Sequence, residues 1–418
     1  MKIFADLHIH SHYSRATSDK MNIKELSHFA KRKGLNVLGT GDFSHPIWSK
    51  ELKELLEPAN EGIFTYNGMS FMLSNEISLM YSQGGRGRKV HLMILSPSFE
   101  VAGQITDWLK TRGRVDYDGR PIFGMSCPEF AEKIMEISEQ NFIIPAHCMT
   151  PWFGIFGSKS GFDSVEECFG DQSNHIKALE TGLSADPEML WRISSLDKFA
   201  LVSNSDSHSP WPSRIGRECN VFELKELTYK NLTNSIKEKD PKRFLYTIEV
   251  DPSYGKYHFD GHRICNFSSS PQESAKLKGI CPVCRKPLII GVLNRVEELA
   301  DRPEGFVPGN AIPFKRLLPL AELISGVVGA APLSKSVVEK EGAFIEHFGS
   351  ELNALLEAPE EELMKVNPEI AKVIMKNRIG KIEFIPGYDG VYGEPILGSK
   401  KKESANRTPD KQKSLADY

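Results

Sequence analysis

The chain of 418 residues is too long for one ordinary hydrophobic core and predicts two or three domains. Its net charge of -3 at pH 7 excludes a strongly basic protein, so contacts with nucleic acid must come from local patches. No run of eighteen apolar residues and no signal-like N-terminus is present, which predicts a cytoplasmic protein without membrane contact. Seven cysteines in so long a chain argue against a disulfide framework and favour reduced thiols or a metal site.

Early in the chain, short apolar runs alternate with amphipathic stretches, which predicts strands joined by helices. We expect strands over residues 2–10, 36–42, 70–77, 89–96, 142–147, 177–180 and 199–205. We expect helices over residues 22–33, 48–57, 128–139, 188–196 and 228–238. Ser126 with Glu129 is typical of a capped helix start. The alternation indicates a parallel sheet with crossover helices, either doubly wound or closed into a slightly distorted seven-stranded barrel.

The first expected strand ends in three alternating polar residues, Asp6, His8 and His10. Alternate residues of a β-strand share one face, so these side chains are expected to point the same way. Two imidazoles and a carboxylate at one strand end make the beginning of a divalent-metal site.

The other expected strands also carry metal-binding residue types at or near their ends. These residues are Asp42, His45, Glu76, His91, His147, Glu180, Asp206 and His208. Active sites of α/β barrels lie at the C-terminal ends of the strands, so most of these side chains should converge. His91 opens its strand and needs a distorted strand to reach the same place. Any one of them alone is more often a buried structural group, but their recurrence predicts a shared metal site.

Two cysteine motifs follow the barrel region, His262-x-x-Cys265 and Cys281-x-x-Cys284. Their spacing is that of a structural zinc site, and His258 competes with His262 for the fourth position. The segment around them has little apolar content, so a bound metal would supply most of its folding free energy.

The remainder of the chain is helix-rich and then polar. Apolar spacing predicts helices over residues 314–324, 337–348, 352–356, 360–366 and 369–376, followed by a short strand and a Gly/Tyr-rich loop. The basic tail is expected to be disordered. It ends with Gln412, Leu415 and Tyr418, whose spacing is similar to the peptide with which DNA enzymes bind the sliding clamp.

The strand-end motifs from Asp6-Leu-His8-Ile-His10 to Asp206-Ser-His208 resemble those of the PHP superfamily, named for polymerases and histidinol phosphatases. The resemblance implies a distorted seven-stranded (β/α) barrel that hydrolyses phosphoesters with up to three metal ions. Clustered divalent ions lower the pKa of bound water and stabilise the entering and leaving oxygens at phosphorus. Imidazole with carboxylate suits Zn²⁺, Mn²⁺ or Fe²⁺ better than Mg²⁺.

The resemblance also implies a ligand set for each ion. The first ion would be held by His8, His10, Glu76 and Asp206, which are the expected catalytic residues. Glu76 would also bind a second ion together with His91 and His147. A third ion would take His208 and the second motif, where Asp42-Phe-Ser-His45 replaces an adjacent Asp-His pair and His45 completes the set. The histidine expected late in the first loop is Ala16 here, with His12 the nearest substitute, and Glu180 is either a ligand or a partner of one.

The zinc motifs and the run from Gly291 to Arg302, added to the barrel, resemble the endonuclease Q family over essentially the whole chain. The resemblance implies a metal-dependent DNA-repair endonuclease that hydrolyses the phosphodiester 5′ of hypoxanthine, uracil, xanthine and abasic sites in double- or single-stranded DNA. The products would carry a 3′-hydroxyl and a 5′-phosphate. The expected domains are a PHP barrel (1–238), a zinc-binding module (239–295), a helical DNA-binding region (296–397) and a basic clamp-binding tail (398–418).

An enzyme that reads one altered base must expose it, and aromatic faces can hold the exposed base. Trp152, Phe153 and Phe156 follow His147 and are the candidates for such a pocket; the alternative is a loop that packs on the barrel. The basic residues Arg86, Arg88 and Lys89, and those of the stretch 110–114, could contact phosphates or be solvated only.

Two functions of other classes stay open. One is a PHP-type phosphoesterase for a small phosphate ester, with the zinc and helical parts as a lid or an oligomer contact. The zinc motifs, the basic tail and its clamp-like end argue against it. The other is a non-catalytic DNA-binding scaffold, against which the near-complete ligand set argues.

Overall fold

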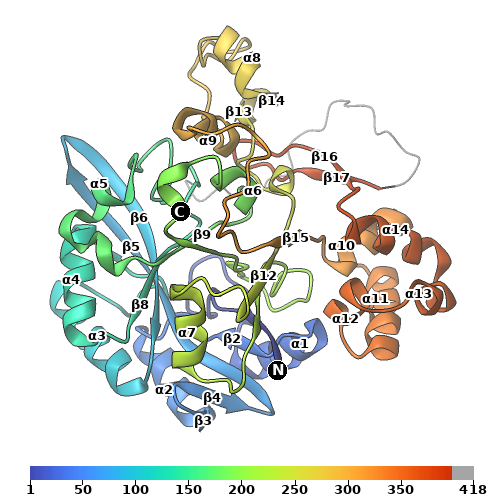
Figure 1. Ribbon diagram of the computed structural model, residues 1–418, viewed down its shortest axis with the longest axis horizontal. Helices are drawn as coiled ribbons and strands as arrows, with labels where there is room; N and C mark the ends of the chain where they lie inside the picture. The colour runs from blue at the N-terminus through green and yellow to red at the C-terminus, as the bar shows by residue number, and fades with distance from the viewer. Residues whose placement is uncertain (398–418) are drawn as a thin grey trace.

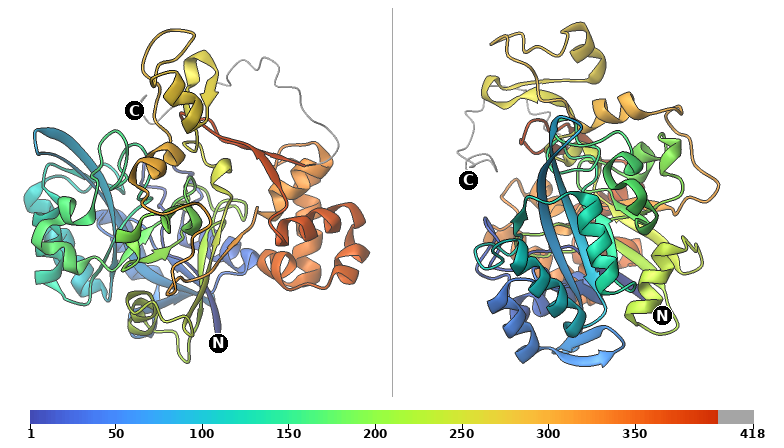
Figure 2. Two further views of the ribbon diagram at one scale, coloured as in Figure 1. Left: turned by 45° about the horizontal axis from the view of Figure 1, so that its top comes forward. Right: turned by 90° about the vertical axis from the view of Figure 1, so that its left-hand side faces the viewer.

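The structure, a computed structural model, describes residues 1–397. A mixed α/β body is built on a central sheet, a small segment around residues 260–285 projects from it, and a group of helices lies at one side (Figure 1, Figure 2). The expected α/β fold with a helical C-terminal region is confirmed. No helix among the described residues is both long and apolar enough to cross a membrane.

The main sheet contains all the expected strands up to residue 147. They are β1 (Lys2–Asp6), β2 (Val37–Gly39), β5 (Met69–Gln83), β6 (Arg86–Ser96) and β8 (Phe142–Pro145). It also contains β3 (Glu57–Asn60), β4 (Ile63–Tyr66), β7 (Ile122–Phe123), β11 (Cys219–Glu223), β12 (Phe244–Glu249) and β15 (Phe314–Arg316). Its path runs β15-β12-β11-β1-β2-β5-β4-β3, with β6 and β7 paired to β5 and β8 paired to β6.

The last two expected strands form a separate parallel pair, β9 (Ala178–Glu180) and β10 (Ala200–Val202). The amide of Cys148 donates to the carbonyl of Glu180 at 2.8 Å, which connects this pair to the end of β8. A bridge between Ile9 and Ser207 connects its other side to the chain after β1. Each expected strand segment is therefore present, whereas the count of seven barrel strands stays a prediction.

The expectation of a parallel sheet is wrong for β6. β1, β2 and β5 run parallel, but β6 pairs antiparallel with both β5 and β8. The reversal occurs because Gly84 and Gly85, with φ of 61° and 73°, close β5 and β6 into a hairpin. It also explains the position of His91. On the reversed β6, His91 lies opposite Ser78, two residues after Glu76 in β5, and its ring reaches the Glu76 carboxylate.

Helices α1 (Ile23–Lys33), α4 (Cys127–Ile137) and α7 (Tyr229–Lys237) begin where the sequence predicts. The side chain of Ser126 accepts a hydrogen bond from the amide of Glu129, which confirms that capped start. The other helices of the body are α2 (Pro46–Leu55), α3 (Phe99–Arg112), α5 (Val165–Phe169) and α6 (Pro187–Leu190). The helix expected over 188–196 is shorter, since Ile193 adopts an extended conformation before a 3-10 turn at Ser194–Leu196.

Five helices form the C-terminal layer around their own apolar core. They are α10 (Leu320–Val328), α11 (Lys335–Phe348), α12 (Glu351–Leu356), α13 (Glu360–Val366) and α14 (Pro368–Arg378). The single helix expected over 314–324 is wrong in its first part. Phe314–Arg316 forms β15 beside β12, and Pro319 stands before α10 because proline fits a helix start but not its interior.

A buried ion pair joins this layer to the body. The Lys33 ammonium at the end of α1 donates to Glu351 Oε1 at 2.7 Å, and the two side chains are 1% and 0% exposed. The ammonium also donates to the carbonyl of Pro212 at 2.8 Å, and Glu351 Oε1 accepts the amide of Leu320 at 3.0 Å. A second pair between the same parts, Lys2 with Glu357, is 37% and 56% exposed.

Replacing Glu351 with Gln should lower the free energy of unfolding by about 3–5 kcal/mol, because the Lys33 charge then stays buried without its counter-ion. Glu357→Gln is the matched control, and solvent screening limits its effect to less than about 1 kcal/mol. Urea unfolding of both variants measures the difference. Equal losses of unfolding free energy in the two variants would contradict the assignment of the buried ion pair as the main polar interaction between the body and the helical layer.

Candidate active site

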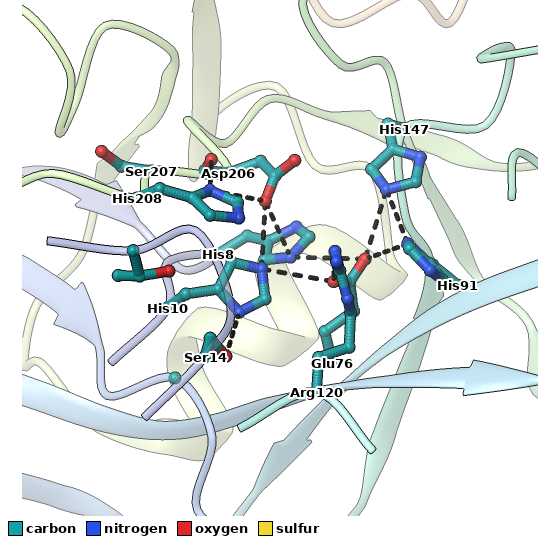
Figure 3. A network of polar contacts seen from close by, with 12 residues as sticks. His8, His10, Ser14, Glu76, His91, Arg120, His147, Asp206, Ser207 and His208 are labelled. Atoms are coloured by element: carbon teal, nitrogen blue, oxygen red, sulfur yellow. Dashed lines mark hydrogen bonds and ion pairs between the residues drawn. The ribbon is translucent and has the colours of Figure 1, made fainter. Parts of the chain in front are cut away.

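Two groups of side chains meet over the strand ends and share one carboxylate (Figure 3). The first group is His8, His10, Glu76 and Asp206, and the second group is Glu76, His91 and His147. Within each group, one nitrogen or oxygen atom from every residue lies within 4.8 Å of the others. All these residues are buried except Asp206, whose side chain is 30% exposed. The sequence-predicted ligands of the first and second ions are therefore brought together.

The first group offers two nitrogens and two carboxylates to one point. His10 Nε2 lies 3.1 Å from Asp206 Oδ1 and 3.3 Å from Glu76 Oε2. His8 Nε2 lies 3.6 Å from Glu76 Oε1 and 3.7 Å from Asp206 Oδ1, and this buried atom has no hydrogen-bond partner. A buried polar atom without a partner is costly, and a cation at this point would satisfy it. The donor set fits a divalent transition metal.

The second group is tighter. Glu76 Oε1 lies 2.9 Å from His91 Nδ1 and 3.2 Å from His147 Nε2, and those two nitrogens are 3.2 Å apart. Burial lowers the pKa of His91 to about 3, with Arg120 and His147 acting in the same direction against Glu76. The neutral imidazole is the form that binds a metal. The two groups together make a centre suited to divalent metal ions.

Each histidine of the first group is held from behind by a second carboxylate. His8 Nδ1 lies 3.0 Å from Glu180 Oε1, and His10 Nδ1 lies 3.1 Å from Asp42 Oδ1. Such contacts fix the ring and leave Nε2 for a metal ion. Glu180 also accepts the amide of His147 at 2.8 Å and the side-chain amide of Asn204 at 2.9 Å. Of the two roles left open for Glu180, the structure gives it that of a partner of the ligands.

Asp42 is placed in the same way, behind His10, and its predicted role as a metal ligand stays a prediction. Its carboxylate lies outside both groups and accepts hydrogen bonds from the Ser11 amide at 2.6 Å, the Ser11 hydroxyl at 2.7 Å and the Ser14 hydroxyl at 2.9 Å. Asp6 also departs from the expected shared face. Its carboxylate accepts the backbone amides of Ser205 and Gly216, at 3.0 and 2.7 Å.

The expected third ligand set does not form a group among the described residues. His45 instead stands at the start of α2, where its ring accepts from the Trp48 amide and stacks on Tyr13 at 4.3 Å between centroids. His208 remains next to the first group, with its ring 4.6 Å from that of His10. Burial and His10 lower the pKa of His208 to about 4. His12 contacts the carbonyl of Met21 and supplies no substitute ligand.

Three of these side chains are directed by residues in the left-handed backbone conformation. Asp42, His147 and Asp206 have φ of 51°, 31° and 45°, a conformation that costs non-glycine residues about 1–3 kcal/mol each. Gly182 presses on His147, since an added Cβ would lie 2.6 Å from the histidine Cβ. Packing thus enforces sharp turns directly after the strands, and these turns direct the side chains to the shared centre.

Arg120 is the one charged residue of the centre that the sequence did not predict. Its Nη1 donates to Glu76 Oε2 at 3.0 Å, and its side chain is 17% exposed. Burial opposes its charge, yet Glu76 and Asp206 raise the pKa of Arg120 above its ordinary value. Arg120 lies in the loop after α3, belongs to no spaced motif and does not follow a predicted strand. The sequence therefore contains no signal that would have identified it.

The predicted aromatic pocket is only partly supported. Phe153 is half-buried and stacks on His91 at 4.2 Å, and Trp152 is half-buried with its ring 5.9 Å from that of Tyr257. Phe156 is 1% exposed, so its predicted place in a pocket is wrong. The chain turns back after Phe153, the Phe156 amide donates to the carbonyl of Cys148, and the ring enters the core.

The basic stretches also contact protein. Arg88 is buried, with its guanidinium 4.0 Å from the ring of Phe162 and hydrogen-bonded to Glu167, so its predicted phosphate contact is wrong. Arg114 is exposed and paired with Asp116. The predicted clamp-binding residues Gln412, Leu415 and Tyr418 lie outside the described residues.

The projecting segment brings the predicted zinc ligands together. His262 ends β13 (Asp260–His262), Cys265 ends a 3-10 turn, and both precede β14 (Phe267–Ser269) and α8 (Pro271–Lys276). His262, Cys265, Cys281 and Cys284 form one group, in which His262 Nδ1 lies 3.3 Å from Cys284 Sγ. Although burial opposes it, backbone amides of the knuckle lower the pKa of Cys281 to about 7, toward the thiolate that binds metals. His258 is outside the group.

The contact of Glu180 with His8 should strengthen metal binding. Glu180→Gln should weaken Mn²⁺ binding by about 10–100-fold, because the ring loses its charged partner. Isothermal titration calorimetry with Mn²⁺ measures this. His45→Ala is the control and should bind Mn²⁺ as the wild type does; a loss as large as that of Glu180→Gln would restore His45 as a ligand.

Known proteins match either a part of this chain or nearly all of it. The family model described as "MJ0043 C-terminal domain" matches residues 319–381, which lie in the helical layer. An uncharacterised protein of Methanocaldococcus jannaschii, MJ0043, is 34% identical over 262 residues, which are 62% of this chain and 32% of that protein, so the chain spans about a third of this relative's length. The uncharacterised YqxK of Bacillus subtilis is 28% identical over 413 residues, which are 94% of this chain and 99% of that protein.

Two solved structures match nearly the whole chain. The lesion-specific endonuclease PfuEndoQ of Pyrococcus furiosus is 35% identical with a TM-score of 0.85, over 95% of this chain and 96% of that chain. An endonuclease Q in complex with a 27-mer duplex that places an abasic lesion at the active site is also 35% identical, with a TM-score of 0.86, over 97% of this chain and all of that one. At this identity and coverage, the chain belongs to the endonuclease Q family of enzymes.

Proposed function

We propose that this protein is a metal-dependent DNA-repair endonuclease that hydrolyses the phosphodiester 5′ of a deaminated base or an abasic site. The observation that carries the proposal is Glu76, which is shared by two groups of metal-binding side chains in a buried centre. A carboxylate shared in this way is typical of enzymes in which two ions act on one phosphate. The products are a 3′-hydroxyl and a 5′-phosphate.

The residues of the chain divide this work. His8, His10, Glu76 and Asp206 would hold one ion, and Glu76, His91 and His147 the other, with Zn²⁺, Mn²⁺, Fe²⁺ or Mg²⁺ as occupants. Bound ions would supply an acidified water as the nucleophile and charge to stabilise the phosphorane-like transition state. Glu180 and Asp42 orient the two histidines of the first group. Asp206 is the most exposed member of that group and therefore faces the side from which a substrate enters.

The family and the loop after His147 support the proposed substrate. The related endonuclease Q was solved with a duplex that carries an abasic lesion at its active site. A damaged nucleotide must leave the helix to reach a buried centre, and this extrusion costs least where pairing is already weak. Phe153 stacks on His91, Trp152 precedes it in the same loop, and both are half-buried. These rings would stack against the extruded or neighbouring base. Both duplex and single-stranded DNA fit this reading.

The proposal also assigns the outer parts of the chain. A structural Zn²⁺ would be held by His262, Cys265, Cys281 and Cys284 in the projecting segment. The helical layer of α10–α14 would contact DNA beside the main body, which extends past the expected boundary at residue 238 because β12 and β15 belong to the main sheet.

Nicking of a labelled duplex with one central hypoxanthine tests the activity. With Mn²⁺ or Mg²⁺, a single cut just 5′ of the lesion is expected, absent from an undamaged duplex. Asp206→Ala should lower the rate at least about 10³-fold, because it removes a ligand of the first group. DNA binding should weaken steeply with salt.

If the duplex stays intact and the protein hydrolyses a small phosphate monoester instead, the substrate is a small phosphate ester and not DNA. If the Asp206→Ala variant cuts the duplex as fast as the wild type, the first group of side chains has no part in the reaction.

Zinc analysis tests the structural site. Cys281→Ser should lose about one zinc per chain and unfold the projecting segment, because that segment has little apolar core of its own. Cys168→Ser, a buried cysteine of the body, should keep its zinc. Metal content and limited proteolysis report the two effects, and a full zinc content in Cys281→Ser would contradict the assignment.

A further inference from the structure

Arg120 stands at the metal centre, and the function proposed above gives it no part. Its loop is fixed from several sides. The Arg120 amide donates to Asp118 Oδ1 at 3.1 Å, and the same carboxylate receives the amide of Arg15 at 3.3 Å. The amide of Ser78 in β5 donates to the carbonyl of Pro121 at 3.0 Å. The loop therefore joins the first loop of the chain to the strand that carries Glu76.

Gly119 brings the same loop against the histidine supports. A Cβ at this residue would lie 2.2 Å from Asp42 Oδ2, the carboxylate that holds His10, so no larger residue fits. The Gly119 amide also donates to the carbonyl of Tyr13 at 3.1 Å. Arg120 is thus positioned by the elements that position the metal ligands, which is how a precise reactive centre is held.

The guanidinium of Arg120 has spare donors. It carries five N–H groups, and among the described residues only Glu76 accepts a hydrogen bond from it. The side chain is 17% exposed, so part of it reaches the surface beside the centre. Figure 3 shows the guanidinium beside Glu76, between the first and second groups. A phosphate at both groups would lie next to it.

Arginine suits this position chemically. Its planar fork pairs with two oxygens of a phosphate, and its charge persists at every physiological pH. Negative charge on the non-bridging oxygens of a phosphodiester rises in the transition state, and a fixed donor there stabilises the transition state more than the ground state.

We propose that Arg120 donates to a non-bridging oxygen of the scissile phosphate and is a catalytic residue of the nuclease. The inference rests on the proposed function. In the reaction, water oxygen bonds to phosphorus as the bond from phosphorus to O3′ breaks. The protons of the water balance the products: one is gained by the leaving O3′ and the other is released from the new 5′-phosphate. Arg120 keeps its own protons throughout.

A different role for Arg120 would be to hold Glu76 in place for the metals. The two roles differ in what they change. Loss of a phosphate contact lowers kcat without weakening Mn²⁺ binding, whereas displacement of Glu76 weakens Mn²⁺ binding first. Kinetics on the hypoxanthine duplex at saturating Mn²⁺, combined with Mn²⁺ calorimetry, separates them.

Arg120→Ala should lower kcat by about 10²–10³-fold without weakening Mn²⁺ binding, because the substitution removes a positive charge next to Glu76. Arg120→Lys should recover only part of the rate, because lysine keeps the charge without the planar fork. Arg114→Ala, in the same loop but exposed and paired with Asp116, is the matched control and should have wild-type kinetics.

Stereopure phosphorothioates at the scissile position give the decisive readout. Sulfur at the oxygen bound by Arg120 should slow the wild type more than it slows Arg120→Ala, whereas the other isomer should slow both equally. Equal effects of both isomers on both proteins, or a parallel fall of Mn²⁺ affinity and rate, would overturn the inference. A wild type that leaves the lesion duplex intact would overturn the proposed function, and this inference with it.

Discussion

The buried carboxylate of Glu76 is the interaction on which the rest of the centre depends. Its Oε1 lies close to His91 and His147, and its Oε2 lies close to His10 and accepts from Arg120. Burial alone would raise the pKa of Glu76, but the surrounding His91, Arg120 and His8 lower it well below its ordinary value. Glu76 is therefore ionised, and one negative charge organises both groups.

Much of the centre could be predicted from sequence because strand ends are visible as patterns. The apolar runs and the polar residues that follow them located His8, His10, Glu76, His147 and Asp206. The pattern could not reveal which carboxylates bind and which support, since Asp42 and Glu180 have the same residue types and the same placement as ligands. That distinction depends on hydrogen bonds from Ser11, Ser14 and the backbone, which only the folded chain brings together.

Other features escaped prediction for different physical reasons. The reversal of β6 depends on two glycines whose effect is visible only in the paired hairpin. Arg120 lies in an irregular loop, where periodicity carries no information. The helix expected from residue 314 begins later because β12 offers Phe314–Arg316 a strand partner, and tertiary pairing overrides local preference.

The buried pair of Lys33 and Glu351 has a consequence for how the chain is made. The partners are separated by 318 positions, so the lysine at the end of α1 has no counter-ion until most of the polypeptide has left the ribosome. Chains fold from the N-terminus as they emerge, and an unpaired ammonium resists burial. The face of the body that carries α1 is therefore completed last, when α12 arrives. A nascent chain stopped short of that helix would lack the counter-ion of Lys33 and would leave this side of the body open.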